Sequence, residues 1–271
     1  MLLASSEIAP RTGRPSRHAL FLHGILGSRS NWRSVARAWV DRHAGWGAVL
    51  PDLRMHGESQ PLDPPHTVAS AAADLDELAG ELEAPVELVV GHSFGGKVAL
   101  AFAEQHGDIA DLWLVDSMPG ARPHARGSED TVAVVSMLES LPAEWESREA
   151  FVERVVEEEQ ERPTAEWLAM NLERTPHGRY TMHLDLPAIR AMLEDYFARN
   201  LWHVLEHPPS AMRIHVVIGD RSPVWAPADR ARVNDIVARD PRVTVHVLDT
   251  GHWVHTEAPD ALLATMTAAG E

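Results

Sequence analysis

The stretch ELVVGHSFGGKVALAF (87–102) decides the fold of this chain. An apolar, partly β-branched run leads into Gly-His-Ser-Phe-Gly-Gly, and small and apolar residues follow at helical spacing. Glycine at Gly91 and Gly95 removes the Cβ atoms that would clash in a very tight turn. The pattern therefore predicts a buried strand that turns directly into a helix, with Ser93 at the tip. A serine in this position is typical of a nucleophile, which needs a base, an acid and an oxyanion site elsewhere in the chain.

Composition limits the classes of function that this chain can serve. Its 271 residues suffice for one large α/β domain, or for a core domain with an insertion. The 24 basic and 40 acidic residues give a formal charge of −16, which argues against binding nucleic acid or an anionic membrane. The absence of cysteine excludes disulfides, thiol catalysis and cysteine-ligated zinc. We expect a cytoplasmic protein, because the N-terminal residues lack a basic n-region and no run approaches the roughly 18 apolar residues of a membrane span.

Short apolar runs recur along the chain and alternate with amphipathic helical patterns. The runs cover residues 18–22, 47–53, 86–91, 111–116, 213–220 and 243–249. Runs of this length and composition suit strands that are buried on both faces. Their alternation with helices predicts βαβ crossovers and a mainly parallel sheet.

The alternation is interrupted once, between about Pro119 and Pro209. No strand-like run occurs there, and polar helical segments take its place. We therefore predict a core domain from residues 1–118 and 210–271 and an all-helical cap from residues 119–209. A cap inserted between two strands lies over the carboxyl end of the sheet, where ligands bind in open α/β folds.

The histidine that follows the last predicted strand is the candidate base for Ser93. This residue, His252, stands in DTGHWVHTEAPDAL, and the order serine, acid, histidine is typical of a strand–turn–helix nucleophile. His255 is expected on a different side of the turn, and His92 is expected to point away from the serine hydroxyl. His203 and His207 have helical ligand spacing, but no HExxH motif and no acidic partner accompany them, so no metal is expected. No GxGxxG follows the first predicted strand, so no nucleotide cofactor is expected either.

Four motifs together resemble the serine α/β-hydrolase superfamily. They are HGILG (23–27), PDLRMHGES (51–59), GHSFGG (91–96) and GHWVHTEAPDAL (251–262). Within the superfamily, DLRMHGES and GHWVHTE most resemble a group of small-cap bacterial esterases and acyl-thioesterases. The resemblance implies an α/β-hydrolase fold, with a mainly parallel central sheet flanked by helices and a helical cap inserted after the sixth strand.

The resemblance also points to the acid. Most members place it three residues beyond the glycine of the strand RIHVVIG, where this chain has Ser222. The esterase group places it after the preceding core strand, where LWLVDSMPG supplies Asp116. We predict Asp116 as the acid, with Asp220 as the alternative and Ser222 as a fourth member that hydrogen-bonds the acid or the histidine.

The backbone amides of Ile25 and Phe94 are implied as the two oxyanion donors. Each such donor contributes roughly 3 kcal/mol to stabilising the transition state. Leu26, Met118 and Trp225 are expected beside the site as part of an apolar acyl pocket.

These residues predict a cofactor-independent serine hydrolase that cleaves small-molecule carboxylic esters of small to medium acyl groups through an acyl-enzyme intermediate. An acyl thioesterase would use the same residues. A C–C bond hydrolase or lyase of this fold would add an arginine from the cap, for which Arg122, Arg126 and Arg179 are candidates. A ligand receptor on the same fold would have lost a member of the triad. The sequence leaves the oligomeric state and the acyl chain length open.

Overall fold

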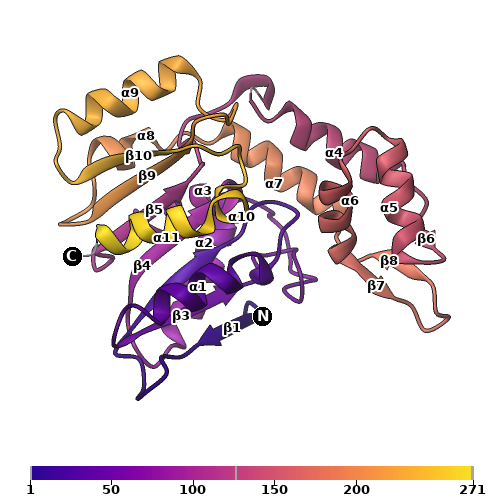
Figure 1. Cartoon of the computed structure of the whole chain (residues 1–271), viewed down its shortest axis with the longest axis horizontal. Coiled ribbons are helices and arrows are strands. Elements are labelled where there is room, and N and C mark those ends of the chain that lie inside the picture. The colour runs from indigo at the N-terminus through magenta and orange to yellow at the C-terminus, as the bar shows by residue number, and fades with distance from the viewer. Residues whose placement is uncertain (1, 126, 270–271) are drawn as a thin grey trace.

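Seven strands form the central sheet in a computed structural model that describes residues 2–125 and 127–269. Their spatial order is β1-β3-β2-β4-β5-β9-β10 (Figure 1). The strands are β1 (Ser5–Ile8), β2 (Arg17–Leu22), β3 (Trp46–Pro51), β4 (Val86–His92), β5 (Asp111–Val115), β9 (Arg213–Gly219) and β10 (Val243–Leu248). All neighbouring pairs are parallel except β1 with β3. The predicted parallel sheet is confirmed, and β1 is an antiparallel edge strand that the sequence pattern did not indicate.

Helices cover both faces of this sheet. Because side chains alternate between the two faces along each strand, the residues that a helix contacts show which face it covers. In β4, Val89 packs on one face and Val90 on the other. On the Val89 face lie α2 (Val68–Gly80), α3 (Phe94–Ala103) and α9 (Pro227–Val237). On the Val90 face lie η1 (Arg29–Trp32), α1 (Arg33–Val40), α10 (Val254–Glu257) and α11 (Pro259–Ala268). Because every residue of α3 is buried, the helix that follows Ser93 is enclosed by the rest of the fold.

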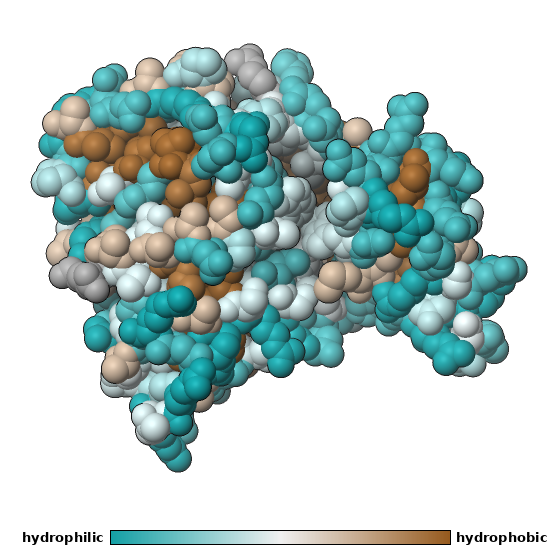
Figure 2. All heavy atoms as spheres, in the orientation of Figure 1, coloured by the Kyte–Doolittle hydropathy of each residue, from teal (hydrophilic) through white to brown (hydrophobic). Residues whose placement is uncertain are grey.

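A long insertion separates β5 from β9. It contains η2 (Pro123–Ala125), α4 (Glu129–Ser140), β6 (Glu144–Trp145), α5 (Arg148–Glu157), α6 (Arg162–Leu168), η3 (Ala169–Asn171), β7 (Leu172–Arg174), β8 (Tyr180–Met182), α7 (Leu186–Ala198) and α8 (Trp202–Glu206). Figure 1 shows most of these elements together on one side of the core, with α7 running back toward it. On the face seen in Figure 2, most residues of the insertion are hydrophilic.

Two expectations about this insertion are wrong. It is not all-helical, because β6, β8 and β7 form a small antiparallel sheet. Strands of two or three residues are too short to show an alternating pattern in the sequence. The insertion also follows the fifth strand of the described chain, β5, and not the sixth. Only β1 to β4 come before β5 in the described residues.

None of the helices in the described ranges combines the length and the apolar character that crossing a membrane requires.

The turn between β4 and α3 is closely packed against backbone. Ser93 has φ 53° and ψ −117°, a backbone conformation that residues other than glycine rarely adopt. A Cβ atom on Gly91 would lie 2.3 Å from the carbonyl oxygen of Gly95, and one on Gly95 would lie 2.4 Å from that of His23. Glycine is therefore required at both positions, because backbone occupies the space that a side chain would need.

Replacing Gly95 tests this packing, and Gly80 provides a matched control. We expect Gly95→Ala to lower the free energy of unfolding by about 3 kcal/mol, because the new methyl group meets backbone atoms that have no room to move. We expect Gly80→Ala to raise it by about 0.5–1 kcal/mol, because Gly80 lies in α2 with nothing within 4 Å of the added atom. Urea denaturation monitored by tryptophan fluorescence measures the free energy of unfolding of both variants. Equal effects of the two substitutions would show that Gly95 is not closely packed against backbone.

Candidate active site

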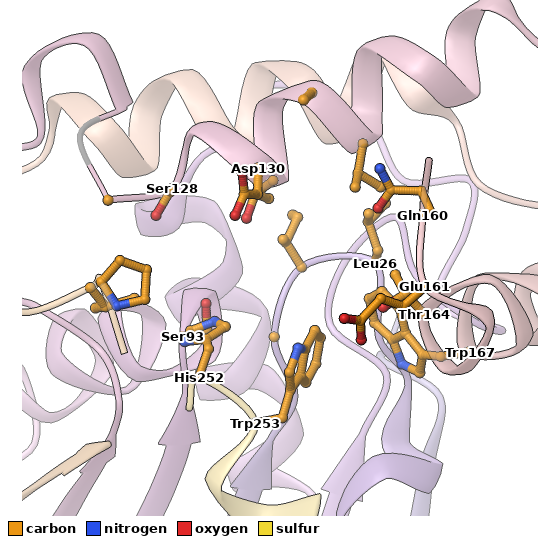
Figure 3. A pocket seen from close by; sticks show the side chains of 18 of the residues that line it. Leu26, Ser93, Ser128, Asp130, Gln160, Glu161, Thr164, Trp167, His252 and Trp253 are labelled. Atoms are coloured by element: carbon orange, nitrogen blue, oxygen red, sulfur yellow. The ribbon is translucent and has the colours of Figure 1, made fainter. Parts of the chain in front are cut away.

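Ser93 lies at the tip of the turn between β4 and α3, where the central strands end. Its amide donates to the carbonyl oxygen of Val115 at 3.1 Å, and its own carbonyl oxygen accepts from the Ser117 hydroxyl at 2.6 Å. The end of β5 therefore holds the strained backbone of Ser93 in place. Ser93 and His252 line the same pocket, and Figure 3 shows both at its base.

His252 reaches this pocket from the loop after β10 and is held by a buried carboxylate. Its Nδ1 lies 2.7 Å from Oδ2 of Asp116, whose side chain is fully buried at the end of β5. The same carboxylate accepts the Ser222 hydroxyl at 2.5 Å and the Gly219 amide at 3.1 Å. Because Nδ1 donates to the carboxylate, Nε2 of His252 carries the lone pair that can accept a proton.

The alternative acid, Asp220, lies elsewhere. Its side chain is 64% exposed and pairs with Arg230 at 3.2 Å. The structure therefore brings Asp116 and Ser222 together with His252 and leaves Asp220 on the surface.

Two backbone amides near the serine, those of Ile25 in the cavity lining and of Phe94 next to Ser93, lack an acceptor in the described chain. Among the described residues, neither the Ile25 nor the Phe94 amide donates a hydrogen bond. The loop that carries Ile25 packs directly against the turn, since a Cβ atom on Gly24 would lie 3.4 Å from that of Ser93. Two unengaged N–H groups beside a serine are the arrangement that an oxyanion site requires.

A pair of buried histidines fixes this loop. His23 accepts the Leu53 amide at Nε2 (2.9 Å), and His56 accepts the Leu26 amide at Nε2 (3.1 Å). Each ring uses Nδ1 on a nearby carbonyl oxygen, that of Gly24 for His23 and that of Arg54 for His56. Burial lowers the pKa of His23 to about 4 and that of His56 to about 3. Both rings are therefore neutral above pH 5, which their role as acceptors requires.

Two further histidines lie beside His252 without being candidates for the base. Nε2 of His92 lies 2.9 Å from the backbone oxygen of His252, while His255 stacks on Trp32 at 4.7 Å. Burial lowers the pKa of His92 well below its usual range and lowers that of His255 to about 4. The contact of His92 with the backbone of the neighbouring histidine was not apparent from the sequence.

A cavity of about 440 Å³ opens above Ser93 between the core and the insertion. Leu26 lines it as expected, whereas Met118 and Trp225 do not. Met118 turns its sulfur to the Gly120 amide, and Trp225 packs edge-on against Trp202. Trp167, a cap tryptophan that the sequence left as a possible pocket residue, lines it as well (Figure 3). The lining residues that the sequence did not indicate include Asp130, Val134, Glu159, Glu161, Thr164, Val224 and Trp253.

Of the arginines considered for a carboxylate clamp, Arg122 and Arg179 do not line this cavity. Arg122 is buried and donates to the Ser128 hydroxyl and to the carbonyl oxygen of Val224. Arg179 pairs with Glu144 at 3.0 Å near the small sheet of the insertion. Arg126 lies outside the described residues.

Comparison with known proteins gives consistent matches. A family model described as "Alpha/beta hydrolase family" matches residues 19–265. The chain is 28% identical over 247 residues to the sn-1-specific diacylglycerol lipase ABHD11 of Danio rerio, covering 89% of this chain and 74% of that protein. It is 25% identical over 257 residues to the esterase YbfF of Escherichia coli (strain K12), covering 90% and 89%. A solved structure of a marine microorganism esterase superimposes with a TM-score of 0.84 at 22% identity, covering 98% of both chains.

The buried histidines predict how stability responds to acid. Their pKa values are lower in the folded protein than the unperturbed 6.5, so below pH 6.5 the unfolded chain binds protons that the folded protein does not. The free energy of unfolding should therefore fall between pH 6.5 and 5, by up to about 1.4 kcal/mol per pH unit for each such histidine. His56→Gln keeps an acceptor for the Leu26 amide and should make the slope shallower. Urea titrations at several pH values measure how the free energy of unfolding depends on pH. If this dependence is the same in His56→Gln as in the wild type, His56 is not buried in its neutral form.

Proposed function

Because the chain belongs to the alpha/beta hydrolase family, we propose that it is a cofactor-independent serine hydrolase that cleaves carboxylic esters of small to medium acyl groups. The 2.7 Å contact between Asp116 and Nδ1 of His252, beside a serine held at a strained turn, carries this proposal. The esterase and lipase among the relatives support it. In this proposal Ser93 is the nucleophile, His252 the base and Asp116 the acid.

The first half of the reaction forms the acyl-enzyme. The Ser93 hydroxyl attacks the ester carbonyl carbon while Nε2 of His252 takes its proton. Asp116 stays ionised and stabilises the imidazolium that forms. The negative charge on the carbonyl oxygen is stabilised by the amides of Ile25 and Phe94. His252 then gives the proton to the leaving alkoxide, which departs as the alcohol.

The second half uses the same groups in reverse. A water molecule replaces the alcohol, and His252 takes a proton from it as it attacks the acyl carbon. The second tetrahedral intermediate collapses, the proton returns to Ser93, and the carboxylic acid leaves. Ser222 donates to Asp116 throughout, so we propose it as a fourth member that holds the carboxylate in position.

The pocket favours an uncharged acyl group. Its volume of about 440 Å³ lies in the lower part of the range for small-molecule sites. Among the described residues that line the cavity, Asp130, Glu159 and Glu161 carry acidic side chains. These carboxylates would repel an anionic acyl chain. We further propose that residues 119–209 act as a cap on a core of residues 1–118 and 210–271, since α4 and α6 supply the outer wall (Figure 3).

Loss of the nucleophile tests the reaction type. We expect the wild-type protein to hydrolyse p-nitrophenyl esters, and Ser93→Ala to lower kcat by at least about 10⁴-fold, because no other hydroxyl replaces the nucleophile. Ser34→Ala, in an exposed position of α1, is the control and should keep wild-type activity. An acetate-to-palmitate series gives the preferred chain length. Wild-type activity in Ser93→Ala would refute the proposal, and turnover of thioesters alone would assign the same residues to an acyl thioesterase.

A pair of aspartate variants identifies the acid. Asp116→Asn removes the charge that stabilises the His252 imidazolium and should lower kcat by about 10³- to 10⁴-fold. Asp220→Asn changes only a surface ion pair and should leave kcat within about twofold. Steady-state kinetics on the preferred ester measures both, and the reverse order would transfer the role to Asp220.

A further inference from the structure

Lys97 is the only lysine in a chain of 271 residues. It lies on α3 one turn after Ser93, and its side chain is completely buried. Among the described residues it forms no ion pair with a carboxylate. Its ammonium group instead contacts three backbone carbonyl oxygens, those of Gly120 (2.8 Å), Tyr196 (2.6 Å) and Arg199 (3.1 Å). It also lies 4.2 Å from the centre of the Tyr196 ring.

All three carbonyl groups belong to two segments of the insertion, one at its start and one directly before α8, its last helix. We call residues 119–122 and 196–201 the neck. Its two sides are hydrogen-bonded to each other, from the Arg122 amide to the Phe197 carbonyl oxygen (2.7 Å) and from the Leu201 amide to the Pro119 carbonyl oxygen (2.9 Å). Lys97 therefore connects the helix that follows Ser93 to both sides of the neck at once.

The chemistry of this contact suits lysine alone. An ammonium group has three N–H donors and matches three carbonyl acceptors, whereas the planar fork of arginine does not. Two of the acceptors lie at the C-terminal end of α7, where the helix dipole favours a cation. The other 23 of the 24 lysine and arginine residues in the chain are arginine, so this position is the exception.

The ammonium group is maintained here at an energetic cost. The pKa of Lys97 is lowered to about 7, chiefly by burial and also by the charges of Arg122 and Arg199, while the charge of Asp195 acts in the opposite direction. A methionine of similar shape would fill the space without that cost. What lysine adds is therefore the set of contacts to the neck.

We propose that Lys97 is a positioning residue that fixes the insertion over Ser93 by tying both sides of the neck to α3. The position of the neck sets the position of the pocket wall, because Arg190 of α7 donates to Glu139 of α4 at 2.9 Å. Val134 of α4 and Trp167 of α6 line the outer part of the cavity. The consequence for substrates rests on the proposed esterase function, whereas the tie itself does not.

The role of Lys97 predicts a loss that depends on acyl length. In Lys97→Met, the carbonyl groups of the neck lose their donor, and the wall formed by α4 and α6 is no longer held. We expect kcat/KM for an octanoate ester to fall about tenfold more than kcat/KM for acetate, whose acyl group reaches only the core residues. Arg37→Met, which removes a cation from the surface of α1, should leave this ratio unchanged.

Hydrogen–deuterium exchange tests the tie without relying on activity. We expect faster exchange in Lys97→Met at the neck, α7 and α4, with α1 and α11 unchanged. Equal exchange with the wild type at the neck, or an increase spread evenly over the core, would overturn the proposal. If no ester is turned over but exchange rises at the neck, the proposed function fails and the tie stands. Should Lys97→Met not fold, Lys97→Gln, which keeps two N–H donors, should show the same local change at smaller size, and wild-type exchange in that variant would overturn the proposal.

Discussion

A single buried carboxylate joins three strand ends of this fold. Asp116 follows β5, and it accepts hydrogen bonds from Gly219 at the end of β9, from Ser222 just beyond it, and from His252 after β10. An ionised carboxylate inside a protein is tolerated only when its oxygens are hydrogen-bonded. The loops after β9 and β10 must therefore converge on Asp116, and that convergence brings His252 to the turn that carries Ser93.

The opposite side of the site depends on neutral groups. The loop with Ile25 is held by His23 and His56, whose buried rings accept backbone amides and so have to be uncharged. The site is thus held by the carboxylate of Asp116 on the side of His252 and by the neutral rings of His23 and His56 on the side of Ile25. None of Asp116, His23 and His56 is among the residues that line the cavity, so the anchors do not occupy it.

Much of this arrangement follows from local sequence. The parallel sheet was predictable from buried strands, and the turn at Ser93 from its flanking glycines, because both patterns are short-range. The position of His252 after the last predicted strand identified it as the base, and the resemblance to a family pointed to Asp116; the structure brings the two together. The insertion was harder, since its strands are too short to show a period. Its contribution to the pocket, such as Trp167, depends on how the insertion packs on the core, and Met118 and Trp225 turn away for the same reason.

The neck has a consequence for how this architecture diversifies. The start of the insertion and the segment before its last helix lie side by side, since the Arg122 amide donates to the carbonyl oxygen of Phe197. A segment whose two ends meet in this way is a module that can be exchanged without lengthening or shortening any core strand. Grafting an insertion from another protein onto the same two ends would change the walls around the ligand and leave the reacting groups untouched. One wall of the cavity can thus change while the core continues to supply Leu26, Val224 and Trp253 to the other.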